Sequence, residues 1–292
     1  MTELDNLSIT GKPGEVEVLG PASDHLDSPS WLNMGGADLA PPYDSYLAKD
    51  SYPLPTAADR EGYHGVRHLD YWLSGLRDHV LLRDRLAERG LSIGAEEAVF
   101  ELGSASGRVS RHFWCQGGHE DMWCADINAR HVEWIRRFLP PKIKVFQNTI
   151  LPHVPIADNS IGLVYAFSVF THLDAYELSW LAELHRFLRP GGVAYLTAHT
   201  ERTWNRLSPE IKLYDKVLQM KKPGGSGLQF TEEDLAGPMP VDRLVVGANQ
   251  VYGTNVFRST DYLRQTWGRF FDVVDIIDAG CEYQDVVILK NR

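Results

Sequence analysis

The sequence predicts an α/β fold: a doubly wound, mostly parallel, seven-stranded sheet with a terminal antiparallel hairpin. Five apolar runs alternate with segments whose apolar residues recur every three or four positions, and this alternation specifies a parallel sheet covered by helices. Two further strands are expected at 271–277 and 285–289, and the short connection between them fits an antiparallel hairpin. Such a sheet binds its ligands where the carboxyl ends of the parallel strands meet.

Length and composition suit one large domain with additions at its ends. The chain has 292 residues, 43% of them hydrophobic, so it can bury a full core. Its formal net charge of -10 argues against DNA, RNA or an anionic membrane as the main partner, because those ligands need a basic face. The cysteines form no Cys-x-x-Cys motif, which indicates neither a disulfide framework nor a zinc site. No secretory signal or membrane-spanning stretch is recognisable, and the cytoplasm is the expected location.

The stretch 1–59 is expected to form a flexible N-terminal arm. It is rich in Gly, Pro, Asp and Ser and shows little apolar periodicity. Aromatic residues in its second half favour packing on the domain at 60–292, where the arm either covers a bound cofactor or only packs. From 62 to 90 the apolar residues recur every three or four positions, which predicts one or two helices before the first strand.

The central motif lies between 98 and 113, where an apolar run ends in Glu101, passes through small residues and resumes as a helical pattern. Small side chains let a ligand approach the backbone amides and the N-terminus of the following helix. Dinucleotide-binding sites typically use the motif Gly-x-Gly-x-x-Gly to bind the pyrophosphate, whereas the spacing here is Gly103-x-Ala105-x-Gly107. Glu101 would repel a pyrophosphate, but it suits the ammonium and sulfonium groups of S-adenosylmethionine.

An acid, one further residue and a Gly-x-Gly-x-Gly loop form the first motif of class I S-adenosylmethionine-dependent methyltransferases. The segment resembles this motif, with Ala105 in place of the central glycine. The resemblance covers about residues 60–290 and implies a Rossmann-like methyltransferase fold with S-adenosylmethionine as cofactor. The expected cofactor contacts are Glu101, Gly103, Ser104, Ala105, Gly107, Asp126, Ile127, Asn148, Thr149 and Phe167.

Two of these contacts have a chemical reason of their own. Asp126 is expected at the end of the second strand, where a carboxylate can accept hydrogen bonds from both ribose hydroxyls. The alternative, that Asp126 caps the next helix, is weaker because Asn128 already fits the N-cap. After a short third strand comes Asn148, whose amide the resemblance places against the adenine edge, although it could also be a turn residue.

A fourth strand is expected at 161–167, followed by the segment Ser-Val-Phe-Thr-His-Leu at 168–173. This segment resembles the fourth motif of a bacterial methyltransferase subgroup associated with sugar or cell-surface glycan modification. Gly162 departs from the Asp that is common in the family, but it lies near the strand start and away from the chemistry. The resemblance therefore favours a glycan or other small molecule as the acceptor.

Farther along the chain, Asp174 and Glu177 have the spacing of a capping box for a helix that ends at Arg-Pro-Gly-Gly. A fifth strand follows at 193–198. The stretch 199–258 is too long for a connecting loop, so we interpret it as a substrate lid with one helix near 211–220. Thr260 is expected to cap the next helix.

Methyl transfer to a hydroxyl requires a base near the carboxyl ends of the strands. His172 follows the fourth strand and His199 ends the fifth, and either imidazole can accept a proton near neutral pH. Each of them could instead be a packing residue. The His and Cys residues between 112 and 124 match no common metal-ligand spacing, so no metal site is expected.

Two alternative functions stay open on the sequence. The chain could be an NAD(P)-dependent oxidoreductase, which Glu101 and the terminal hairpin both oppose. It could also be a non-catalytic methyltransferase-like module that binds the cofactor or a partner protein, which Ala105 and Gly162 would permit.

Overall fold

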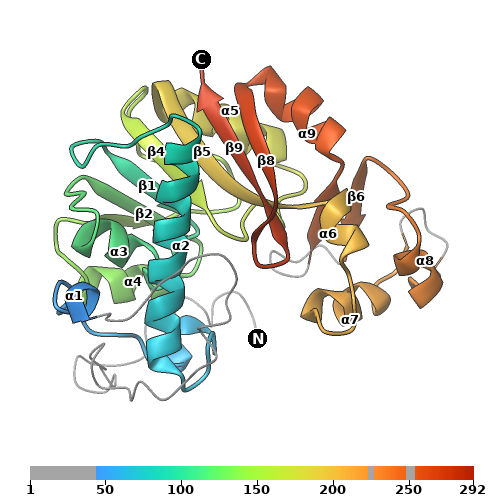
Figure 1. Ribbon diagram of the computed structural model, residues 1–292, viewed down its shortest axis with the longest axis horizontal. Coiled ribbons are helices and arrows are strands. Elements are labelled where there is room, and N and C mark those ends of the chain that lie inside the picture. The colour runs from blue at the N-terminus through green and yellow to red at the C-terminus, as the bar shows by residue number, and fades with distance from the viewer. Residues whose placement is uncertain (1–43, 223–226, 248–253) are drawn as a thin grey trace. The chain divides into compact units, whose positions relative to one another are not determined.

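The structure is a computed structural model that describes residues 44–222, 227–247 and 254–292 (Figure 1). The chain separates into two compact units, residues 1–149 and residues 150–292. Residues 1–43 of the predicted arm lie outside the described part of the chain.

The first unit contains three parallel strands in the order β3-β2-β1. These strands are β1 (Val99–Leu102), β2 (Met122–Asp126) and β3 (Lys144–Gln147). The helices of this unit are α1 (Asp44–Leu47), the 3₁₀ helix η4 (Ala58–Arg60), α2 (His68–Glu88), α3 (Ser110–Cys115) and α4 (Ala129–Phe138). The helical pattern at 62–90 thus corresponds to one helix, α2, and Asn128 caps α4 as predicted by accepting a hydrogen bond from Arg130 N at 2.9 Å.

The second unit combines parallel and antiparallel strands. In it β4 (Ile161–Ala166), β5 (Leu188–Thr200) and β7 (Asn255–Arg258) pair in parallel. The antiparallel strands are β6 (Arg243–Val246), β8 (Phe271–Cys281) and β9 (Gln284–Asn291). The helices are α5 (Glu177–Phe187), α6 (Glu201–Asn205), α7 (Lys212–Leu218), α8 (Glu232–Ala236), α9 (Thr260–Thr266) and the 3₁₀ helix η5 (Trp267–Arg269).

The terminal hairpin is confirmed as β8 and β9, and β9 lies beside β5 in Figure 1. β9 pairs with β5 so that Ala198 faces Asp285, and the hairpin turn therefore lies at the carboxyl end of β5. The seven strands expected from the sequence are β1 to β5, β8 and β9. The predicted α/β class, with a mostly parallel sheet and an antiparallel edge, is confirmed.

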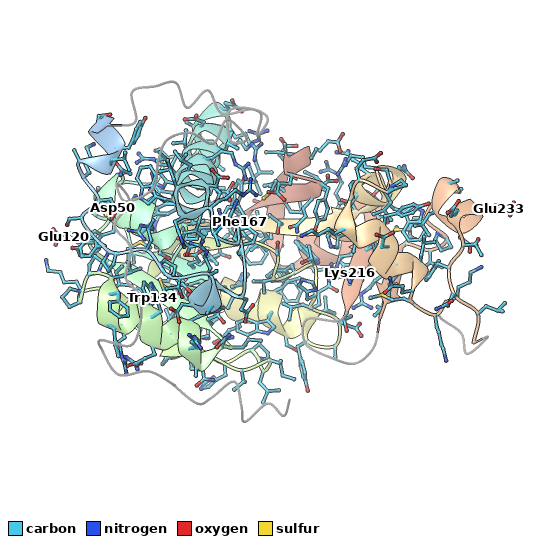
Figure 2. The ribbon with its side chains drawn as sticks, turned by 90° about the horizontal axis from the view of Figure 1, so that it is seen from below. Asp50, Glu120, Trp134, Phe167, Lys216 and Glu233 are labelled. Atoms are coloured by element: carbon cyan, nitrogen blue, oxygen red, sulfur yellow. The ribbon has the colours of Figure 1, made fainter. Side chains whose placement is uncertain are left out.

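Residues 199–258 build a hydrophobic core of their own within the second unit. Trp204, Val217 and Phe257 are fully buried in it, and every buried member of this core comes from 204–257. The predicted helix near 211–220 is α7, whereas the short helices α6 and α8 and the short strands β6 and β7 were not predicted. Figure 2 labels Lys216 on α7 and Glu233 on α8, the two helices that flank the undescribed residues 223–226.

The described end of the predicted arm packs tightly into the first unit. Asp50 and Arg111 of α3 form an ion pair with an Nε–Oδ2 distance of 2.7 Å, and both side chains are 0% exposed. Trp72 of α2 donates its indole N–H to the same carboxylate at 2.7 Å, and Leu54 is fully buried. Asp50 therefore ties the chain segment before η4 to α2 and α3.

Two predicted helix caps are wrong. The N-cap of α5 is Tyr176, without a side-chain hydrogen bond, so Asp174 and Glu177 form no capping box. Glu177 is instead buried, and its carboxylate accepts hydrogen bonds from Arg258 Nε at 2.7 Å and Trp267 Nε1 at 2.6 Å. A buried guanidinium is a stronger partner for this carboxylate than a backbone amide at a helix end. Similarly Ser259, not Thr260, caps α9 by accepting from Tyr262 N at 3.0 Å.

Across the described ranges, no helix combines the length and the apolar character needed to cross a lipid bilayer.

Candidate active site

The small-residue loop between β1 and α3 has the backbone geometry that its sequence predicts. Gly103, Ala105 and Gly107 have φ angles of 75°, 45° and 78°, all in the left-handed region that favours glycine. At Gly107 a Cβ would lie 2.4 Å from Leu139 Cδ1, so a larger residue would displace that side chain. Ala105 adopts the left-handed conformation despite its Cβ, and its amide is tied down by Asp126.

Asp126 closes this loop from the end of β2. Its Oδ2 accepts a hydrogen bond from Ala105 N at 2.7 Å, and its Oδ1 accepts one from Asn128 N at 2.8 Å. His131 Nδ1 lies 3.4 Å from Oδ1. A carboxylate has about four lone-pair sites, so Asp126 retains acceptor capacity beyond these two amides.

Glu101 is the acid of the central motif, and it organises the start of α3. Its Oε2 accepts hydrogen bonds from Ser110 N at 3.1 Å and from the Ser110 hydroxyl. The same hydroxyl lies 3.1 Å from the sulfur of Cys124, a buried residue of β2. Burial raises the pKa of the Cys124 thiol, and the nearby Glu101 carboxylate raises it further. Glu101 therefore has a structural role in addition to the predicted contact with a cofactor.

Two side chains near these acids keep unsatisfied polar atoms. Asn148 donates its amide to Thr149 O at 3.0 Å, while its buried Oδ1 has no hydrogen-bond partner among the described residues. Within the same described set, the buried hydroxyl of Ser104 is also without a partner. The backbone carbonyl of Ile127 accepts a hydrogen bond from Gln147 Nε2 at 3.0 Å. Because an unsatisfied buried polar group is costly, Asn148 Oδ1 and Ser104 Oγ are candidate ligand contacts.

The segment around η4 reaches the loop and the end of β2, which the sequence analysis missed. Asp59 accepts a hydrogen bond on its carbonyl from the Ser106 hydroxyl, and its carboxylate pairs with Arg130 at 2.8 Å. Asn128 Nδ2 donates to Glu61 Oε1 at 2.7 Å. The only signal in the sequence is the charged run Asp-Arg-Glu at 59–61, which has no distinctive spacing.

In the second unit, the chain turns sharply after β4. Phe167, labelled in Figure 2, lies 5.9 Å from the Tyr195 ring between centroids. The next residue, Ser168, has a φ of 57°, and its amide donates to the Thr197 hydroxyl at 2.7 Å. The Ser168 hydroxyl also contacts the side chain of Gln284, at the start of β9. The end of β4, β5 and the hairpin turn are thus connected by polar contacts.

His172 is oriented by a backbone carbonyl. Its Nδ1 lies 2.6 Å from Thr254 O, and because a carbonyl can only accept, Nδ1 carries the proton. The neutral ring therefore presents the lone pair on Nε2. The pKa of His172 is lowered, chiefly by burial, although the hydrogen bond to Thr254 opposes the shift.

His199 occupies a more enclosed position at the end of β5. Its ring stacks on Phe257 and on Tyr283, with centroids 5.1 Å and 5.9 Å away, and it is 2% exposed. Burial lowers the pKa of His199 to about 3, and the neighbouring His172 contributes to the shift. Its Nδ1 has no hydrogen-bond partner among the residues that the structure describes.

A buried arginine, also missed by the sequence analysis, holds the segment that carries His172. Arg258 of β7 donates to Phe170 O at 2.9 Å and to Leu173 O at 2.7 Å, and its Nε pairs with Glu177. Val256 N donates to Thr171 O at 2.8 Å. The insertion at 199–258 therefore supplies, through β7, the contacts that fix the backbone on both sides of His172.

Other features of the second unit lack the arrangement of a reactive centre. A cavity of about 410 Å³ is lined by residues of α6, by 238–242 and by Ser259. The carboxylates in its lining already accept hydrogen bonds, Glu201 from Thr260 at 2.7 Å and Asp242 from Ser259 at 2.8 Å. Over the whole described part of the chain, no three His, Cys, Asp or Glu residues are grouped as a metal site would require.

The comparisons with known proteins agree with the central motif. A family model described as a methyltransferase domain matches residues 100–196. This segment is therefore similar to methyltransferase domains, which agrees with the resemblance of the central motif. Its cofactor is S-adenosylmethionine, as the sequence predicted. The methyltransferase match leaves the oxidoreductase alternative without support.

Two solved structures are similar to this chain. The PH0226 protein of Pyrococcus horikoshii is 12% identical, with a TM-score of 0.50, and the alignment covers 81% of this chain and 94% of that one. A 1,6-didemethyltoxoflavin-N1-methyltransferase of Burkholderia thailandensis, with bound 1,6-didemethyltoxoflavin and S-adenosylhomocysteine, is 14% identical, with a TM-score of 0.48 and coverage of 88% and 92%. At these identities the likeness concerns the fold alone. No curated protein matches the chain.

Proposed function

We propose that this methyltransferase transfers the methyl group of S-adenosylmethionine to a hydroxyl oxygen of a sugar or other small molecule. The support for this acceptor class is the resemblance of the segment 168–173 to a glycan-modifying subgroup, together with a net charge of -10 that disfavours nucleic acid. A hydroxyl acceptor must lose a proton, and the chain offers an oriented imidazole for that step at the end of β4.

The cofactor contacts belong to the same proposal. The residues fit a cofactor with cationic groups and no phosphate, because two carboxylates, Glu101 and Asp126, flank the small-residue loop. Asp126 would accept the ribose hydroxyls, Glu101 would face the ammonium group, and the free Oδ1 of Asn148 would accept from the adenine amine. Backbone atoms of Gly103, Ser104, Ala105, Gly107, Ile127, Thr149 and Phe167 would complete the contacts.

When bound, S-adenosylmethionine supplies a methyl carbon activated by its sulfonium, so the chain itself has to position the acceptor and remove a proton. The observation that carries the proposal is the hydrogen bond from His172 Nδ1–H to Thr254 O at 2.6 Å. It leaves Nε2 unprotonated and fixes the plane of the ring. We therefore assign proton acceptance to His172 Nε2.

His199 is the second candidate for the base. Its pKa of about 3 makes it a weak proton acceptor at neutral pH. The ring is also buried, and it stacks on Phe257 of β7 and on Tyr283 of the hairpin turn. We assign His199 a packing role beside the base, and we assign to the arm 1–59 and the insertion 199–258 the roles of cofactor cover and acceptor lid.

The test separates chemistry from cofactor binding. A panel of sugars and other hydroxylated small molecules is screened for release of S-adenosylhomocysteine, and the best acceptor is used with His172→Asn and His199→Gln. The Asn amide can still donate to Thr254 O but cannot act as a base, and the Gln amide can still reach the Asn255 side chain that bonds His199. We expect His172→Asn to lower kcat by about 10²- to 10⁴-fold with S-adenosylhomocysteine affinity unchanged, and His199→Gln to keep most of the turnover.

If His172→Asn turns over as fast as the parent protein, His172 is not the base. If only His199→Gln loses turnover, His199 is the base. Cofactor binding without turnover on any acceptor would instead favour the non-catalytic module.

A further inference from the structure

A group of cationic and polar side chains gathers in the first unit next to the small-residue loop. We call it the Tyr71 cluster, and its members are Arg60, His64, Arg67, Tyr71, Arg77 and Arg108. The Arg60 guanidinium carbon lies 4.8 Å from the centroid of the Tyr71 ring, and the His64 ring lies 6.4 Å from it. None of these residues was singled out as a cofactor or catalytic residue by the sequence.

Tyr71 brings a buried hydroxyl that nothing in the described chain satisfies. The residue is 2% exposed, and its hydroxyl has no hydrogen-bond partner among the described residues. Burial raises the pKa of Tyr71 to about 12, so the hydroxyl keeps its proton and is available as a donor. Leaving such a group unpaired is costly, which indicates that a ligand completes it.

His64 adds a second unsatisfied atom in a strained segment. Its φ is 61°, and Glu61, Gly62 and Gly65 around it also have positive φ angles. Non-glycine residues hold this conformation only where their surroundings enforce it, and such strain concentrates at ligand sites. Within the described residues, His64 Nε2 is buried without a partner. Burial and four nearby arginines lower the pKa of His64 to about 4, so the ring is neutral and can donate from Nε2–H.

The charges around these two donors favour an anion. Asp78 forms ion pairs with Arg108 at 2.6 Å and with Arg77 at 3.0 Å. Asp70 forms an ion pair with Arg67 at 3.0 Å. Asp78 and Asp70 thus pair with three of the arginines, while Arg60 donates to the carbonyls of Pro55 and Gly65 at 3.0 Å and 2.6 Å. This concentration of positive charge stands out in a chain with a net charge of -10.

The cluster is built against the cofactor loop. At Gly75 of α2 a Cβ would lie 2.0 Å from the carbonyl oxygen of Arg108, so helix and loop end are in direct backbone contact. The negative charge of Glu101, the acid of the central motif, raises the pKa of Tyr71, so this acid interacts electrostatically with the cluster. The Tyr71 cluster therefore lies near Glu101, the residue that we assign to the ammonium group of the cofactor.

We propose that the Tyr71 cluster binds a carboxylate, with the Tyr71 hydroxyl and His64 Nε2–H as its neutral donors and the arginines supplying the charge. The site extends the proposed function, because the carboxylate belongs either to the methionyl end of the cofactor or to an acidic acceptor. Both sources present the same chemistry to the cluster.

The experiment compares two cofactors that differ by one carboxylate. S-Adenosylmethionine and decarboxylated S-adenosylmethionine are titrated calorimetrically into the intact protein, Tyr71→Phe and His64→Asn, since Asn tolerates a positive φ. Tyr46→Phe is the matched control, because Tyr46 packs on the same apolar cluster as Tyr71. Acetate is then titrated into the protein saturated with S-adenosylhomocysteine, as a probe for an acceptor carboxylate.

If the cofactor supplies the carboxylate, Tyr71→Phe and His64→Asn weaken S-adenosylmethionine by about tenfold or more and leave the decarboxylated form unchanged. If the acceptor supplies it, both cofactors keep their affinities, and acetate binds the saturated intact protein and Tyr46→Phe but neither of the other variants. If all variants bind every probe with the same affinity as the intact protein, the proposed carboxylate site is wrong. The proposed function fails separately, since it requires S-adenosylmethionine to bind the intact protein at all.

Discussion

Gly107 occupies a backbone conformation and a space that suit only glycine. Its φ is +78°, and a Cβ would lie 2.4 Å from Leu139 Cδ1. We expect Gly107→Ala to lower the free energy of unfolding by roughly 2–4 kcal/mol, from the left-handed backbone and the displaced leucine together. We also expect weaker S-adenosylhomocysteine binding, because the loop amides move with the residue. Urea denaturation and calorimetry measure the two effects.

Gly118→Ala is the matched control for this substitution. Gly118 has a φ of +70°, but beyond its chain neighbours no atom of the described residues would lie within 4 Å of a Cβ there. Its substitution should therefore cost only the backbone term, about 1–2 kcal/mol, and leave cofactor affinity unchanged. If both variants lose the same stability, the contact with Leu139 contributes nothing.

At the scale of elements, a buried ion pair joins the segment before η4 to α3. Asp50 and Arg111 are both 0% exposed, and Arg111 also donates to the carbonyls of Tyr52 and Pro53. We expect Asp50→Asn to lower the free energy of unfolding by about 3–5 kcal/mol, because it leaves a buried guanidinium without its counter-charge. Guanidinium chloride denaturation of the full chain measures the loss.

Asp121→Asn provides the comparison in the same unit. Asp121 pairs with Lys144 at 2.7 Å, but the two side chains are 46% and 48% exposed. An exposed pair contributes at most about 1 kcal/mol, so this variant should unfold nearly as the parent does. Equal losses in the two variants would show that burial of the Asp50 pair has no energetic consequence.

For the whole molecule, buried histidines predict loss of stability in mild acid. Burial is the first cause of a lowered pKa at six of the 11 histidines, namely His64, His79, His112, His119, His172 and His199. Unfolded histidine takes up a proton near pH 6.5, whereas these rings stay neutral in the folded chain to lower pH. Because the unfolded state then binds more protons, stability must fall as the pH drops below about 6.5.

The slope can be assigned to individual rings. Each buried histidine contributes up to about 1.4 kcal/mol per pH unit between its unfolded and folded pKa values. We expect the free energy of unfolding, followed by urea denaturation from pH 7.5 to 4.5, to decline steeply. His79→Gln should make the decline shallower, since burial lowers the pKa of His79 to about 3. A flat profile over this range would contradict the account.

The parts of the molecule that the sequence predicted well are those with local signals. The strand–loop–helix at 98–113 follows from apolar periodicity and small residues, and both the fold class and the cofactor are confirmed. The helix caps show the limit of local signals. Glu177 has the spacing of a capping residue, yet its partner Arg258 lies 81 positions along the chain.

The site shows the same limit. Arg111 finds Asp50 across 61 positions, and His199 is enclosed by rings from β7 and the hairpin turn. No periodicity encodes such pairs, because they arise only when distant elements pack. The assignments of individual cofactor and catalytic residues therefore stay predictions.

The contact between Cys124 and Ser110 has a practical consequence. A thiol with a raised pKa and no exposure cannot react with a maleimide until β2 and the start of α3 separate. The alkylation rate of Cys124 thus reports how often this corner of the first unit opens. Since Ser110 donates hydrogen bonds to Glu101, we expect a ligand bound to Glu101 to slow the labelling, so that the alkylation rate would report occupancy of the proposed cofactor site.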